Sequence, residues 1–109
     1  MLTLDAYQVE AAKTAIYPKQ FSIMYPALGI SAEAGEVANK VKKIYRDKDG
    51  RIDEASRLAI ADEVGDVLWY LACLSSDLGI DLSQVAQRNL DKLYSRLERG
   101  VLGGSGDNR

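Results

Sequence analysis

The stretch Gly29-Ile-Ser-Ala-Glu-Ala-Gly-Glu-Val-Ala-Asn-Lys-Val-Lys-Lys-Ile44 has a partial copy thirty residues further along the chain, Ala59-Ile-Ala-Asp-Glu-Val-Gly-Asp-Val-Leu-Trp-Tyr-Leu-Ala-Cys-Leu74. In both copies an isoleucine is followed at fixed spacing by a glutamate, a glycine, a second acid and a valine. Apolar residues that recur every three or four positions predict an amphipathic helix for each copy. Because no strand-like alternation occurs anywhere in the chain, we expect an all-α fold.

Capping residues, prolines and glycines predict where the helices begin and end. We expect four helices: Thr3 (N-cap) to about Ile16 ahead of Pro18, a start between Ser22 and Pro26 to about Tyr45, Asp53 (N-cap) to Leu78 with Gly79 in the left-handed position, and Asp81 (in a capping box with Gln84) to Arg99. Residues 1–100 are expected to form a single domain, and the glycine-rich residues 101–109 a flexible tail.

The composition is that of an ordinary globular chain. Of the 109 residues, 47% are hydrophobic and 28% charged, and the net charge of −2 provides no footprint for nucleic acid or an anionic membrane. The N-terminus has no signal-peptide pattern, and no apolar run reaches about 18 residues. The single cysteine, Cys73, excludes an intrachain disulfide. We therefore expect a cytoplasmic protein that binds neither nucleic acid nor membrane.

The chain contains no histidine, which removes most familiar catalytic schemes. Ser-His-Asp and Cys-His nucleophiles, zincin motifs and the Glu-x-x-His pairs of di-iron bundles all need that residue. Any chemistry must therefore be carried out by carboxylates, lysines, tyrosines and a bound ion.

Four acids are the candidate metal ligands: Glu33, Glu36, Glu63 and Asp66. A step of about 100° per residue places each pair at the edge of the apolar stripe of its helix. If the two stripes pack antiparallel, the pairs face each other, and the carboxylates repel unless a cation joins them. Oxygen-only ligands suit a hard ion such as Mg²⁺ or Mn²⁺. The alternative is a solvated acidic face, which is the usual role of a single Glu-x-x-Glu.

Two glycines and one unusually apolar helix predict assembly. Gly35 and Gly65 lie inside helices, where glycine costs about 1 kcal/mol relative to alanine, so we expect another backbone to approach closely there. The side of residues 54–78 away from the main stripe is also apolar. Four helices cannot easily bury both sides, which favours a homo-oligomer over a monomer with a large central helix.

A second constellation lies on the last expected helix. Asn89 falls within its apolar stripe, with Lys92 and Arg96 beside it, a set that would suit a nucleobase, a ribose or phosphates. The alternative is a buried, satisfied Asn with snorkelling basic neighbours. Lys40 and Lys43 are likewise typical of a helix C-terminus unless an anionic ligand is close.

The segments 28–43, 62–71 and 89–93 together resemble the MazG-like nucleoside triphosphate pyrophosphohydrolases, and the resemblance covers about residues 7–97. It implies a four-helix subunit in an intertwined dimer or dimer of dimers. It also implies Mg²⁺-dependent hydrolysis of a nucleoside or deoxynucleoside triphosphate to the monophosphate and pyrophosphate. Carried over by position, the acids would be metal ligands and five residues would contact the substrate: Lys40, Lys43, Asn89, Lys92 and Arg96.

The mechanism that this resemblance implies is attack of water at the α-phosphorus, with one acid as the base. Glu36 is our first choice for that base, and Tyr17-Pro18 resembles a stretch that lines the pocket. Two other functions remain open. One is a non-catalytic helical oligomerisation module with a structural metal; the other is hydrolysis of a different nucleotide-like metabolite, such as phosphoribosyl-ATP.

Overall fold

The computed structural model describes residues 1–109, and all of its regular elements are helices, as the sequence predicts. In chain order they are α1 (Leu4–Ala12), the short 3₁₀ helix η1 (Lys19–Phe21), α2 (Met24–Lys48), α3 (Glu54–Asp77) and α4 (Leu82–Glu98). None of these helices is long and apolar enough to cross a membrane.

The predicted helix starts are confirmed by their capping contacts. Thr3 accepts a hydrogen bond from the backbone N–H of Ala6 (3.0 Å), and Asp53 accepts one from that of Ser56 (2.8 Å). The side chain of Gln84 returns to the backbone N–H of Asp81 (3.4 Å), which is one half of the predicted capping box. These contacts satisfy donors that the first turn of a helix leaves without a partner.

The predicted end of the first helix is wrong. Helix α1 stops at Ala12, four residues before Ile16, because the chain turns there toward α3. The Thr14 hydroxyl donates to the carbonyl of Ala11 (2.8 Å) and accepts from the indole N–H of Trp69 (2.7 Å). These two side-chain contacts hold the chain in a turn at Thr14, where a continued helix would have only its backbone hydrogen bonds. Helix α2 also differs slightly from prediction, since it continues three residues beyond Tyr45.

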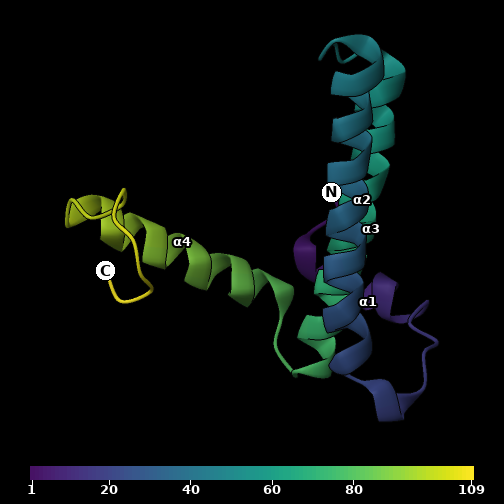
Figure 1. The fold of residues 1–109 in the computed structure, drawn as a ribbon. Coiled ribbons are helices and arrows are strands. Elements are labelled where there is room, and N and C mark those ends of the chain that lie inside the picture. Colours follow the sequence, from purple (N-terminus) through teal and green to yellow (C-terminus); the bar gives the residue numbers. More distant parts are fainter.

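Helices α2 and α3 form a long antiparallel hairpin, the main feature of the fold (Figure 1). Helix α1 packs against the C-terminal half of α3, where Ala11, Ala72 and Leu82 are buried together. Buried Gln8 links this cluster to the start of α4: it donates to the carbonyl of Ile80 (3.0 Å) and accepts from the N–H of Leu82 (2.7 Å).

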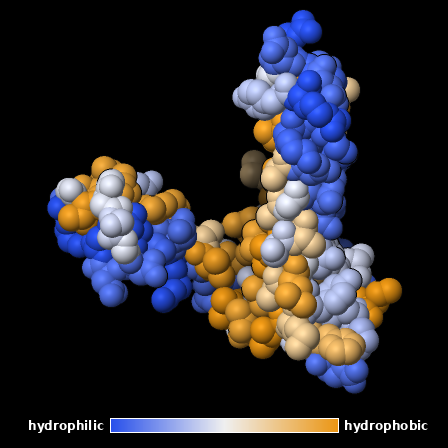
Figure 2. Space-filling view, viewed as in Figure 1, coloured by the Kyte–Doolittle hydropathy of each residue, from blue (hydrophilic) through white to orange (hydrophobic).

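Helix α4 leaves the hairpin at a wide angle, so the subunit is open (Figure 1). Its radius of gyration is 16.8 Å, against about 13 Å for a compact domain of this length. Its accessible surface is 7924 Å², against about 6,000 Å² for a compact protein of this mass. Figure 2 shows hydrophobic residues gathered at the lower end of the hairpin, where much of this surface is apolar.

Candidate metal centre and its surroundings

Three of the four predicted acids come together across the hairpin. Glu33 of α2 and Glu63 and Asp66 of α3 each offer a carboxylate oxygen, and these oxygens all lie within 4.8 Å of one another. The antiparallel packing of the two helices produces this grouping, since it brings equivalent edges face to face. Glu33 and Glu63 are half-buried, whereas Asp66 is exposed. Glu36 is exposed and does not belong to the group.

The charge state of this cluster reflects its crowding. The pKa of Glu33 is raised by burial, by a hydrogen bond with Glu63 and by the negative charge of Asp66. The raised pKa reflects the cost of holding several negative charges close together. A hard divalent cation would remove that repulsion, and three carboxylate oxygens on two helices are the donors that Mg²⁺ takes from proteins. The residues present therefore fit the expected ion.

Lys40 supplies a positive charge at the same place. Its Nζ lies 3.4 Å from Oε1 of Glu63, and their side chains are 36% and 16% exposed. Lys40 is thus the predicted substrate residue that the structure brings directly to the acids. Together with Lys43 it also lines a hollow of about 190 Å³ between α2 and the start of α3.

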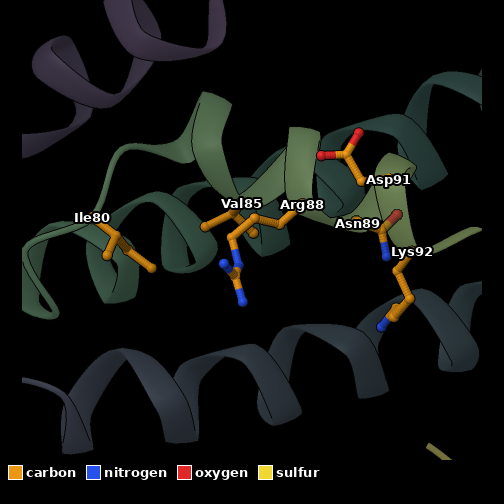
Figure 3. A pocket seen from close by; sticks show the side chains of 6 residues that line it. All are labelled: Ile80, Val85, Arg88, Asn89, Asp91 and Lys92. Atoms are coloured by element: carbon orange, nitrogen blue, oxygen red, sulfur yellow. The ribbon is translucent and has the colours of Figure 1, made fainter. Parts of the chain in front are cut away.

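The predicted residues of α4 lie elsewhere in the subunit. Asn89 and Lys92 line an open hollow of about 620 Å³ along α4, together with Arg88, which the sequence reasoning missed. In Figure 3 the charged ends of Arg88 and Lys92 point to one side of the helix, and Asp91 points to the other. Arg88 lies one turn before Lys92, so helical spacing could have identified it.

Arg96, the fifth predicted substrate residue, is buried rather than free. It is 7% exposed, and its guanidinium donates to the carbonyl of Asp107 (3.2 Å) in the C-terminal segment. That segment folds back through Arg109, which donates to the carbonyl of Val101 (3.2 Å). In this structure Arg96 therefore binds the chain's own C-terminus.

A row of tyrosines adjoins the acids. Tyr17 stacks on Tyr25 with ring centroids 4.8 Å apart, and Tyr25 lies 6.0 Å from Tyr70. A hydrogen bond with Tyr25, burial and the charges of Glu33 and Asp66 all contribute to a raised pKa for Tyr70. Tyr17 belongs to a stretch that the sequence had indicated. Tyr25 and Tyr70 were not among the site residues that the sequence predicted. Tyr70 nevertheless shares a helix edge with Glu63, which lies seven residues before it.

Three helical glycines differ in what surrounds them. The Tyr70 ring lies directly against Gly29, so that a side-chain carbon at this position would overlap the ring. Gly35 and Gly65, for which we expected a close approach, have no other group within 4 Å of where a Cβ would stand. Within one subunit the close contact is therefore at Gly29.

Comparison with known proteins identifies the protein family. Residues 25–101 match the family model described as "MazG nucleotide pyrophosphohydrolase domain". The chain is 52% identical to "Gene 37 protein" of Mycobacterium phage L5, over 97% of this chain and 98% of that protein. It is 32% identical to "Uncharacterized protein YpjD" of Bacillus subtilis (strain 168), over 70% of this chain and 68% of that protein. No solved structure matches the chain.

The chain therefore belongs to the MazG family of nucleotide pyrophosphohydrolases. Its class of activity is hydrolysis. The matched segment contains α3, α4 and all of α2 but its first residue, and so it includes all four predicted acids.

Proposed function

We propose that this protein hydrolyses a nucleoside or deoxynucleoside triphosphate to the monophosphate and pyrophosphate in the presence of Mg²⁺. The observation that carries the proposal is the grouping of Glu33, Glu63 and Asp66, whose carboxylate oxygens lie within 4.8 Å of one another. Acids held this close on two helices suit a divalent cation, and nucleotide hydrolases use such a cation at the phosphates.

The three grouped acids would hold the ion, which when bound neutralises triphosphate oxygens and favours in-line attack of water. Glu36 is on the same helix as Glu33 but lies outside the group. A carboxylate that does not take part in coordination is free to accept a proton, so we assign Glu36 as the base for water attacking the α-phosphorus. It would join the metal ligands only if the site contracts on binding.

Lys40 has a second role in this scheme. Its ammonium lies 3.4 Å from the Glu63 carboxylate. When a cation occupies the acids, that ion pair is weakened and the Lys40 ammonium becomes available to a phosphate oxygen. Lys43, which shares a hollow with Lys40, would add a further positive charge for the released pyrophosphate.

We further propose that the protein works as a homo-oligomer. The surface in excess of that of a compact protein is about 2,000 Å², enough for a stable interface. Three leucines on α4 are also exposed, Leu90 by 43%, Leu93 by 36% and Leu97 by 58%. Gly35 and Gly65 also have no other group within 4 Å of where a Cβ would stand, and so leave room for the backbone of a second copy.

Assembly would also complete the substrate site. Asn89 and Lys92 lie on α4, which diverges from the hairpin that carries the acids (Figure 1). In an oligomer, α4 of one copy can place these residues beside the acids of another. The tyrosine row next to Glu33 and Asp66 provides an aromatic surface on which a nucleobase can stack.

The test is a product assay with Mg²⁺ on a panel of nucleoside and deoxynucleoside triphosphates, with phosphoribosyl-ATP assayed beside them as the alternative substrate. We expect pyrophosphate and the matching monophosphate from at least one member of the panel. Light scattering on the same sample should give a mass at least twice the 12.0 kDa of one chain. If no nucleotide of the panel releases pyrophosphate, but the metal still raises the melting temperature, a non-catalytic module with a structural metal is favoured.

A further inference from the structure

The segment between α1 and α2 ends in a strained turn. Ile23 has φ 69° and ψ −56°, and the N–H of Met24 donates to the carbonyl of Ser22 (2.8 Å). This is a γ-turn of the positive-φ type, which is rare and strained for any residue with a side chain. For a β-branched residue the conformation is a genuine outlier and persists only where neighbouring groups impose it.

Packing of the Ile23 side chain does not explain the turn, because that side chain is 47% exposed. Its neighbours Phe21 and Met24 are also exposed, by 41% and 59%. Ile23 precedes α2 and has no side-chain cap of its own to offer. The constraint on the turn must therefore come from a polar contact.

Asp77 provides that contact. One oxygen of its carboxylate, Oδ2, accepts from the backbone N–H of Ile23 (2.9 Å) and from the hydroxyl of Tyr17 (2.8 Å). Asp77 is the last residue of α3, so these bonds join positions 54 and 60 residues apart in the sequence. Burial and the bond to Asp77 hold the pKa of Tyr17 far above its usual value, so its hydroxyl remains a donor.

The same contact sets the position of the tyrosine row. The Tyr17 ring, fixed at its hydroxyl, stacks on Tyr25 at 4.8 Å, and Tyr25 lies 6.0 Å from Tyr70 beside the acids. Tyr25 is in the first turn of α2, directly after the strained turn. Loss of the Asp77 carboxylate therefore affects both partners of the stack, Tyr17 through its hydroxyl and Tyr25 through the turn at Ile23.

We propose that Asp77 is a positioning residue, which holds the γ-turn at Ile23 and the Tyr17 hydroxyl so that the tyrosine row forms one wall of the nucleotide site. The proposal rests on the proposed function for its substrate, but the hold on the turn is a property of the chain alone. Asp77 need not touch the nucleotide. Its loss should weaken substrate binding more than it slows the chemical step.

The test compares Asp77→Ala with Glu98→Ala in the full-length protein. Glu98 is the matched control because it is the last residue of α4, as Asp77 is of α3, and is exposed. In Asp77→Ala we expect faster amide hydrogen exchange in residues 13–24, with KM raised about tenfold and kcat changed less than about twofold. Glu98→Ala should leave exchange and both kinetic constants unchanged.

A second variant separates positioning from general destabilisation. Glycine adopts positive φ without steric cost, so Ile23→Gly in the Asp77→Ala background should recover part of the lost substrate affinity. Tyr17→Phe, which removes one of the two bonds, should raise KM less than Asp77→Ala does. Tyr17→Phe does not contain the Asp77 substitution, so it remains informative if Asp77→Ala proves poorly folded.

Wild-type exchange in residues 13–24 of Asp77→Ala, or an unchanged KM, would overturn the proposal. So would a loss of kcat equal to the change in kcat/KM, or the same effects in Glu98→Ala. If the wild-type protein releases no pyrophosphate, the proposed function fails. The exchange measurement then still decides whether Asp77 holds the turn.

Discussion

Replacement of Lys40 by methionine should strengthen metal binding, although it removes a residue from the centre. The Lys40 ammonium lies 3.4 Å from the Glu63 carboxylate, so an incoming cation must displace it or share that acid with it. Methionine retains the length of the side chain and removes the charge. The ion would then meet three carboxylates with no internal competitor.

The size of this effect follows from the exposure of the pair. The Lys40 side chain is 36% exposed, and ion pairs of this kind contribute about 0.5–1 kcal/mol in solution. Loss of that competition corresponds to an affinity about two- to fivefold higher. Nucleotide affinity should fall in the same variant, because a phosphate contact is lost. The two affinities are therefore expected to move in opposite directions.

Isothermal titration calorimetry measures both affinities. A titration with Mn²⁺ gives the metal affinity, and a second titration with a non-hydrolysable nucleotide in the presence of Mn²⁺ gives the nucleotide affinity. Lys43→Met is the control, since Lys43 is the neighbouring lysine and forms no ion pair with the acids. An unchanged Mn²⁺ affinity in Lys40→Met would refute the competition. An equal gain in Lys43→Met would show that only the general charge of α2 matters.

Three further predictions concern the same centre. Glu63→Gln should abolish turnover and leave the helical circular dichroism spectrum intact, because it removes a ligand and also relieves repulsion; turnover at the wild-type rate would exclude Glu63 from the site. Without metal, stability should fall as pH rises through the raised pKa of Glu33, since the folded state binds that proton more tightly; saturating Mg²⁺ should remove this dependence, which melting curves between about pH 4 and pH 7 can follow. Gly29→Ala should lower stability by about 1–3 kcal/mol, because the added carbon overlaps the Tyr70 ring; a denaturant midpoint equal to that of wild type would contradict this packing.

Local patterns in the sequence predicted most of the fold. Thr3, Asp53 and Gly79 marked helix ends because caps act through bonds to their own turn of backbone. The early end of α1 could not be read in this way, since it depends on Thr14 meeting Trp69, 55 residues later. The direction of α4 was also unpredictable, because a short connection specifies no angle between helices.

In the candidate site, too, the sequence predicted some features and could not predict others. Periodicity brought Glu33, Glu63 and Asp66 together, since all three lie at the facing edges of two apolar stripes. Glu36 lies three residues beyond Glu33, just as Asp66 lies three residues beyond Glu63, but only Asp66 joins the group. Spacing along the helix therefore could not show that Glu36 is exposed and outside the group. The turn at Ile23 had no signal, because nothing in the sequence marks a β-branched residue for positive φ.

The most direct test of the central claim is hydrolysis in oxygen-18 water with Mg²⁺ and the best nucleotide of the panel. Attack at the α-phosphorus places the label in the nucleoside monophosphate and leaves the pyrophosphate unlabelled, and this is the result that the carboxylate centre predicts. Label in the pyrophosphate would mean attack at the β-phosphorus. Release of orthophosphate in place of pyrophosphate would contradict the proposed reaction altogether.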